Sequence, residues 1–242
     1  MSESGVLPGA VGVSRLCVYD TLAPDGLVGG TPHMHLCCAE AYLVTAGTGA
    51  VQTLASGGFV RTQLQPGSVV WFPPGTIHRL VNSGGLKMVV LMQNSGLPEA
   101  GDAVFTFPPD VLADPEAYAA AATLPEGGAP GSDLGAAYRR RDLAVEGFRL
   151  LRTAYQQRGP AALDAFHAAA VALVAPRLDE WRKRWLTGAL AAAEATGAQL
   201  DALVRGDPSH LRDGGVFSLA EPTERGRLGM CGLLDTYQIE KV

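Results

Sequence analysis

The sequence contains little of what marks secreted proteins. Only four of its 242 residues are cysteine. These cysteines are Cys17, Cys37, Cys38 and Cys231. Because their spacing is not that of a disulfide framework, we expect free thiols in a reducing compartment. The first residues, MSESGVLPGAVGVS, show neither the basic region nor the apolar region of a secretory signal. We therefore expect a cytoplasmic protein.

An excess of positive charge is also absent. The 19 Lys and Arg residues are outnumbered by 24 Asp and Glu residues, which gives a net charge of −5. This charge provides no general attraction to nucleic acid or to an anionic membrane. Every long apolar run is cut by Pro, Gly or charge before it reaches membrane-spanning length. We expect neither partner, and predict that two basic clusters are solvated helix faces, Arg139-Arg140-Arg141 and Arg182-Lys183-Arg184.

The first part of the chain, from about residue 11 to residue 93, contains short apolar runs separated by Gly, Pro, Asn and Ser. Their spacing and β-branched content predict successive antiparallel strands of a sandwich or barrel. The stretches ASGGF at 55–59 and VNSGGLK at 81–87 are predicted hairpin turns. Residues 1–107 are therefore assigned to a β-barrel domain.

The remainder divides into three segments. Residues 108–132 are rich in Pro, Gly and Ala, which predicts a linker with one short helix around Pro115–Ala122. Residues 133–206 form a predicted helical region, which is either a small bundle or a cover over the barrel. Residues 207–242 look extended, with two alternatives: an edge strand that rejoins the barrel or a segment that docks on a partner chain.

The apolar period within residues 133–206 indicates three amphipathic helices. The first face is formed by Ala144, Phe148, Leu151 and Tyr155. A break at Gly159-Pro160 precedes the second face, formed by Leu163, Phe166, Ala170 and Leu173. The third stretch begins near Leu178, contains Trp181 and Trp185, and ends near Arg205. Both tryptophans are predicted to lie in a core or an interface, or to form a lid on the barrel mouth.

Two of the five histidines are separated by one residue, just before a strand-like segment. His33 and His35 share one face of an extended chain, and a neutral imidazole offers one ring nitrogen to a metal. Glu40 can add an oxygen after a short turn. His78, which follows the rigid turn Pro73-Pro74-Gly75, can add a third imidazole from an adjacent strand. We predict that these four residues are metal ligands.

At these residues the sequence resembles the cupin superfamily, whose two motifs are roughly G-x5-H-x-H-x3,4-E-x6-G and G-x5-P-x-G-x2-H-x3-N. The first motif is matched by His33, His35, Glu40 and Gly47, although Leu27 stands at the position of its opening glycine. The second is matched throughout, by Gly67, Pro73, Gly75, His78 and Asn82. The resemblance covers roughly residues 10–95. It implies a cupin-type double-stranded β-helix, or jelly-roll barrel, with a divalent metal in its mouth.

This ligand set suits Fe²⁺, Mn²⁺, Ni²⁺, Zn²⁺ or Cu²⁺, and we favour Fe²⁺. A six-coordinate ion would keep two open positions for a small-molecule substrate and O₂. The expected function is a metal-dependent cupin enzyme of the oxygenase or dioxygenase type, acting on a small organic metabolite. One alternative is a metal-dependent isomerase or epimerase of a hydroxy-carbonyl or sugar substrate; another is a non-catalytic ligand-binding or sensor cupin. The resemblance also implies a homodimer.

The oxygenase is favoured because the barrel segment offers few inward-facing cations that could hold a sugar phosphate. The uncertain candidates for that role are Arg15, Arg61 and Lys87. Glu40 is a candidate catalytic residue, and so is Tyr42, which shares its face; an ordinary core tyrosine is the alternative for Tyr42. Cys37 would face the metal if the strand continues past His35.

Overall fold

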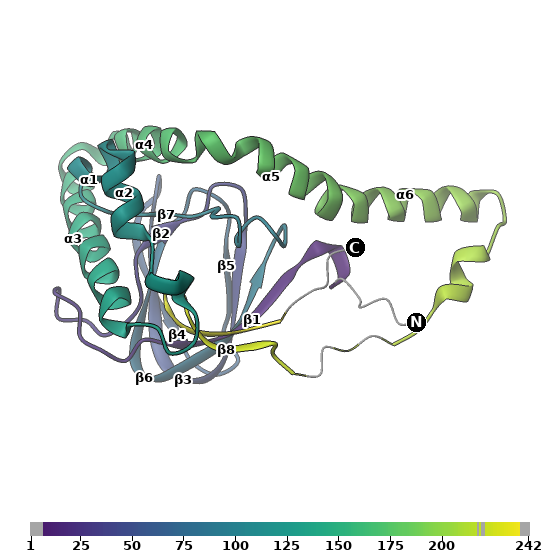
Figure 1. Ribbon diagram of the computed structural model, residues 1–242, viewed down its shortest axis with the longest axis horizontal. Helices are drawn as coiled ribbons and strands as arrows, with labels where there is room; N and C mark the ends of the chain where they lie inside the picture. Colours follow the sequence, from purple (N-terminus) through teal and green to yellow (C-terminus); the bar gives the residue numbers. More distant parts are fainter. Residues whose placement is uncertain (1–6, 217, 219–220, 238–242) are drawn as a thin grey trace.

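The computed structural model describes residues 7–216, 218 and 221–237, and it shows a β-barrel covered on one side by helices (Figure 1). Two strands of its antiparallel sheet are 16 residues long, and each of them combines short apolar runs that the sequence predicts as separate strands. The strands are β1 Gly12–Val18, β2 His33–Met34, β3 Glu40–Ala55, β4 Gly58–Leu64, β5 Val69–Phe72, β6 Ile77–Met92, β7 Val104–Phe105, β8 Glu224–Leu228 and β9 Gly232–Thr236.

The long strands β3 and β6 form the centre of the sheet, whose order is β4-β3-β6-β1-β9-β8. The first residues of β3 pair with β5 and its last residues pair with β4. The short strand β2 lies between β6 and β7. Because the long strands contribute to both ends of the sheet, it can roll into a barrel, and the mainly β fold with a helical extension is confirmed.

The prediction of a hairpin turn at residues 81–87 is wrong, because strand β6 continues through this stretch without ending. The pairing of β3 with β6 shifts register near Gly47, where a Cβ atom would lie only 2.2 Å from the carbonyl carbon of Gly85. The Asn82 side chain supports the bulge by accepting hydrogen bonds from the amides of Gly84 and Leu86. The glycines thus bend a continuous strand instead of ending it. The turn expected at residues 55–59 does join β3 to β4.

The C-terminal segment returns to the barrel. Strand β9 pairs with β1 in an antiparallel register that places Leu234 opposite Leu16, and β8 pairs with β9. A hydrogen bond from the Tyr19 hydroxyl to the Gly229 carbonyl, 2.9 Å long, holds the turn between β8 and β9. Of the two alternatives for residues 207–242, strands β8 and β9 therefore show a return to the barrel in this chain, with β8 at the edge of the sheet.

The helices follow β7 along the chain. The break at Gly159-Pro160 lies where the sequence predicts it, and a helix spans Pro115–Ala122 within the predicted linker. The first long helix begins ten residues before the predicted apolar face. The α-helices are α1 Pro109–Ala113, α2 Pro115–Ala122, α3 Leu134–Arg158, α4 Asp164–Val174, α5 Leu178–Trp185 and α6 Ala191–Val204. Short 3₁₀ or π segments are Pro8–Ala10, Pro125–Gly128, Gly159–Leu163, Ala175–Arg177, Leu186–Leu190 and Ser209–Asp213.

Helices α3 and α4 share one hydrophobic core with the barrel. Phe148 and Phe166 pack in the same cluster as Ile77 and Phe105. Trp181 is buried in this cluster too, whereas Trp185 is 39% exposed, so only one of the two tryptophans is a core residue. Helix α6 buries no side chain and extends beyond the barrel (Figure 1). The first basic cluster is not a solvated face, because its second and third arginines are buried.

Among the described residues, one helical run is long and apolar enough to cross a membrane, although the sequence predicts no membrane span. It extends over Leu134–Val204, and its 18-residue window has a mean hydropathy of 1.3 with 28% of the window buried. Core helices of soluble proteins pass the same test, and Phe148 and Val174 of this run lie in the core shared with the barrel. The result is therefore weak evidence for a membrane span.

The packing of α3 on the barrel depends on Gly147. A Cβ atom at this position would lie 2.0 Å from the carbonyl oxygen of Thr106, directly after β7. We expect Gly147→Ala to lower the free energy of unfolding by about 1–3 kcal/mol, because the helix must shift away. Alanine is otherwise about 1 kcal/mol better than glycine inside a helix. Urea unfolding followed by circular dichroism measures the change.

Gly197→Ala is the matched control, because no atom lies within 4 Å of a Cβ at this position of α6. It should raise the free energy of unfolding by about 0.5–1 kcal/mol. Equal stabilisation by both substitutions would contradict the close contact between α3 and the barrel.

Candidate metal centre

The four predicted ligands come from three neighbouring strands. His33 lies on β2 and is paired in register with His78, the second residue of β6, while His35 directly follows β2 and Glu40 opens β3. All four side chains are buried, and one possible ligand atom from each lies within 4.8 Å of the others. Antiparallel pairing thus brings residues 45 positions apart in the sequence to one point inside the barrel.

Hydrogen bonds to backbone carbonyls orient all three imidazoles. The Nδ1 of His33 lies 2.8 Å from the Thr31 carbonyl oxygen, and that of His78 lies 3.1 Å from the Thr76 carbonyl oxygen. The His35 Nδ1 is bonded in the same way to the carbonyl oxygen of Asp102. Because a carbonyl only accepts, each Nδ1 donates its proton, which leaves the Nε2 lone pair free for a metal.

The donor set fits a divalent ion. His78 Nε2 and Glu40 Oε2 are buried and 3.0 Å apart, and neither has a hydrogen-bond partner within the described ranges. His35 Nε2 lies 3.4 Å from the same oxygen. At metal–ligand distances of about 2.0–2.2 Å, ligand atoms on one ion lie about 3–4 Å apart, so small side-chain movements suffice. The cluster can bind a metal.

Burial and mutual contact set the charges of the cluster. Burial, reinforced by the nearby His78 and His35, lowers the pKa of His33 well below its usual range, which keeps this imidazole neutral. Burial would raise the pKa of Glu40, but the two histidines outweigh it and hold that pKa well below its usual range. Burial lowers the pKa of His35, but Asp102 and Glu40 raise it by more, to about 10, so its Nε2 carries a proton that a metal must displace.

Asp102 is a site residue that the sequence motifs do not reveal. It is fully buried, and its Oδ1 accepts hydrogen bonds from the amides of Leu36 and Cys37 at 3.1 and 2.8 Å. Its Oδ2 lies 3.7 Å from His35 Nδ1. Asp102 therefore fixes the turn after β2 and orients His35. An aspartate in a loop 67 residues after His35 carries no spacing signal, so only the fold connects the two.

A cavity of about 350 Å³ opens onto the cluster. Its wall is formed by β1, β3, β6 and β9, together with residues near Pro98 and one arginine of α3. Tyr42 lines this cavity, and its buried hydroxyl has no hydrogen-bond partner in the part of the chain that the structure describes. Burial, together with the adjacent Glu40, raises the pKa of Tyr42 well above its usual range, so the phenol is protonated.

Other candidate residues do not reach the cavity. The chain leaves the strand after His35, so Cys37 is exposed and does not face the metal site. Arg15, Arg61 and Lys87 are exposed. The cations on the cavity wall are instead Arg140 and Arg227. Sequence reasoning missed both, because they lie outside the cupin motifs and reach the barrel through α3 and β8.

The rolled sheet and its buried ligand cluster define a jelly-roll barrel with a candidate metal site. Residues 18–93 match the family model of the cupin domain, so this part of the chain is a cupin domain and the resemblance read from the two motifs is confirmed. The match does not include the helical region. No curated protein matches the sequence.

Several solved structures are similar to part of the chain. The capsular polysaccharide assembling protein CapF from Staphylococcus aureus is 23% identical over 40% of this chain and 28% of its own, with a TM-score of 0.31. Streptomyces Pac13 is 14% identical over 43% of this chain and 69% of its own, with a TM-score of 0.31; its structure is described as that of a nucleoside dehydratase. The Drosophila melanogaster CENP-C cupin domain is 21% identical over 34% and 58%, with a TM-score of 0.26. These overlaps are partial, and nothing about the activity of this chain follows from them.

Replacing His78 tests the cluster. We expect His78→Ala to reduce bound divalent metal from about one ion per chain to below about one tenth, because removing an imidazole breaks the set of donors. Elemental analysis of protein purified without chelator gives the metal content, and circular dichroism gives the fold. His210→Ala, which changes a histidine outside the cluster, should keep the metal. Equal metal content in both variants would refute the assignment.

Replacing Asp102 tests the support of His35. Asp102→Asn retains an oxygen for the amides of Leu36 and Cys37 but removes the charge near His35. Metal affinity should fall by about 10- to 100-fold, the usual cost of losing a residue that orients a ligand. Competition with a chromogenic chelator measures the affinity. Asp110→Asn, at an exposed position of α1, should leave it unchanged, and unchanged affinity in both variants would contradict a role for Asp102.

Proposed function

We propose that the protein is a metal-dependent cupin enzyme that acts on a small organic metabolite, and that its reaction is an oxygenation of the Fe²⁺ type. One observation carries this proposal: three oriented imidazoles and one carboxylate converge at a cavity of about 350 Å³. His33, His35, Glu40 and His78 would hold the ion. A ferrous ion held by such a set supplies O₂ chemistry at the positions that the protein leaves open.

The chain itself contributes orientation and exclusion of water. Apolar side chains on the cavity wall limit access of solvent to the reacting groups; they are Leu16, Val90, Met92, Met230 and Leu234. Tyr42 supplies a neutral hydroxyl that has no hydrogen-bond partner among the described residues. We assign it the role of donating a hydrogen bond, or a proton, to a substrate oxygen.

A metal-dependent isomerase or epimerase of a hydroxy-carbonyl substrate is the second candidate. The observation in its favour is the pair of cations on the cavity wall, Arg140 and Arg227. The sequence disfavours an isomerase because the barrel segment itself offers few inward-facing cations, and these two arginines come from outside that segment. An isomerase also needs a base that is free to move a proton. Glu40 is part of the ligand cluster, and the Glu99 carboxylate accepts a hydrogen bond from the Gly96 amide at 2.7 Å. The oxygenase therefore stays the favoured reaction.

Oxygen consumption separates the two reactions. The purified protein is loaded with Fe²⁺ without air and then mixed with air-saturated buffer and a panel of small hydroxy acids and hydroxy-carbonyl compounds. We expect at least one compound to be consumed together with O₂, measured with an oxygen electrode and by mass spectrometry of the product.

His78→Ala should abolish this consumption, whereas His210→Ala should retain it. Deuterium incorporation from D₂O into a compound without O₂ uptake would instead support the isomerase. A metal-loaded protein that changes no compound by either route would contradict catalysis over the panel tested.

A further inference from the structure

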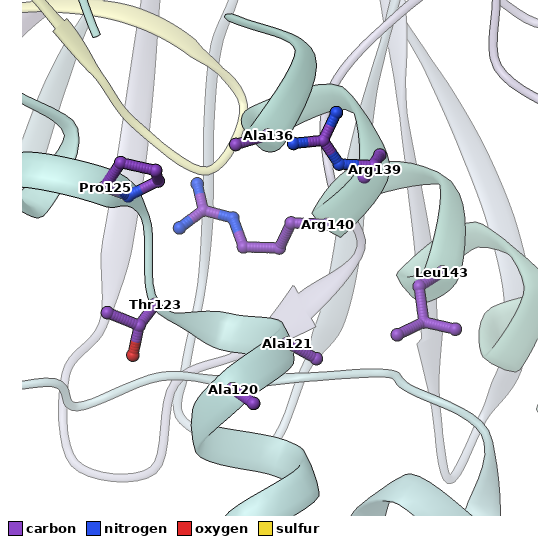
Figure 2. Close-up of a pocket in the computed structure, with 8 residues that line it drawn as sticks. All are labelled: Ala120, Ala121, Thr123, Pro125, Ala136, Arg139, Arg140 and Leu143. Atoms are coloured by element: carbon purple, nitrogen blue, oxygen red, sulfur yellow. The ribbon is translucent and has the colours of Figure 1, made fainter. Parts of the chain in front are cut away.

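Arg140 is the feature that connects the helical region to the metal cavity. It belongs to α3, and only 9% of its surface is exposed. Its side chain lines the metal cavity and also a second cavity of about 320 Å³ between α2 and α3. Figure 2 shows it extending from α3 across this second cavity toward the segment that carries Thr123 and Pro125. One arginine thus lines both cavities.

No acidic side chain neutralises Arg140 in the part of the chain that the structure describes. Its Nη1 donates to the Ala122 carbonyl at 3.1 Å and its Nη2 to the Gly229 carbonyl at 2.9 Å. Its Nε is buried and has no partner among the residues that the structure describes. A guanidinium has five N–H groups, so three remain for another acceptor.

The other two buried arginines each have an acidic partner, which Arg140 lacks within the described residues. Arg79 is fully buried and pairs with Asp25, and Arg141, the next residue of α3, pairs with Asp142 at 2.8 Å. A buried charge without an opposite charge is costly, and burial accordingly lowers the pKa of Arg140. The fold therefore provides an acid for two of its three buried arginines but leaves the one that lines the metal cavity without one.

Phe105 relates Arg140 to the metal ligands. Its ring centroid lies 4.9 Å from the Arg140 Cζ atom and 6.4 Å from the ring centroid of His33. Because one phenylalanine ring contacts both residues, a molecule of a few carbon atoms can reach from the Arg140 guanidinium to the metal ligands. The second cation on the wall, Arg227, is already paired with Glu224 at 3.0 Å, so among the described residues Arg140 is the one arginine of the wall without an acidic partner.

We propose that Arg140 binds a carboxylate of the substrate, and that the substrate is a small organic acid with one end at the metal ligands and its carboxylate at Arg140. This inference rests on the proposed function, because it assigns a substrate class to the same cavity. A carboxylate matches the remaining N–H groups of a guanidinium in shape. Its single negative charge also matches the single unpaired cation, whereas a phosphate dianion calls for more.

Calorimetric titration of the purified full chain, loaded with Zn²⁺, tests the proposal. The two probes are succinate and its monoamide succinamate, which keeps one carboxylate for the metal but replaces the other with an uncharged amide. We expect the wild-type protein to bind succinate at least tenfold more tightly. Arg140→Gln should weaken succinate binding at least tenfold and leave succinamate binding within about twofold.

Arg139→Gln is the matched control, because Arg139 is the preceding residue of α3 and its side chain is exposed and paired with Asp133. It should change neither affinity. If Arg140 only ties the carbonyls of Ala122 and Gly229 together, Arg140→Gln will lower the melting temperature but retain succinate affinity, which overturns the proposal. Tighter binding of inorganic phosphate than of succinate would also overturn it.

Two measurements keep the result interpretable. If Arg140→Gln does not fold, the wild-type comparison decides, and less than a tenfold preference for succinate contradicts the proposal. Metal content is measured on the same samples. A protein that holds Zn²⁺ without preferring the diacid refutes the role of Arg140 alone, whereas a protein that holds no metal refutes the proposed function.

Discussion

The candidate site depends on the convergence of four side chains that could bind a metal, inside a barrel where the described residues leave their Nε2 and carboxylate atoms facing one another. A buried carboxylate and three buried imidazoles are costly unless each polar atom is satisfied. Backbone carbonyls satisfy the Nδ1 atoms, which leaves the Nε2 atoms and the Glu40 oxygen facing one another. Strands β2, β3 and β6 must therefore keep their register, because a slip of one residue would turn each ligand to the opposite face.

The barrel alone does not complete the site. Strand β9 forms part of the cavity wall, and α3 adds the only α-helical residue that lines it within the described residues. Gly147 lets α3 approach the chain beyond β7, and the Tyr19 hydroxyl holds the β8–β9 turn. Segments outside the cupin motifs thus determine part of the chemistry of the wall. A match confined to residues 18–93 contains no information about them.

How far the sequence predicts this molecule follows from the range of its signals. The two histidine motifs and the alternation of short strands are local patterns, and they were sufficient for the barrel and for the four residues that meet in it. VNSGGLK was misread because a Gly-Gly pair serves a bulge as well as a turn, and only Asn82 and the facing Gly47 decide between them. Asp102 and Arg140 act through long-range contacts, which no spacing rule encodes.

The misreading of the arginine cluster also changes the reasoning about substrate. Three consecutive arginines suggest a solvated face, but a helix turns about 100° per residue, so they point in three directions. Arg139 faces solvent, Arg141 is held by Asp142 and the carbonyls of Thr21 and Leu22, and Arg140 faces the cavity. A site that seemed too apolar for an anion therefore contains a cation whose charge nothing in the described chain balances. An apolar wall with one such cation favours a substrate that is mainly hydrocarbon and singly charged at the end remote from the metal ligands.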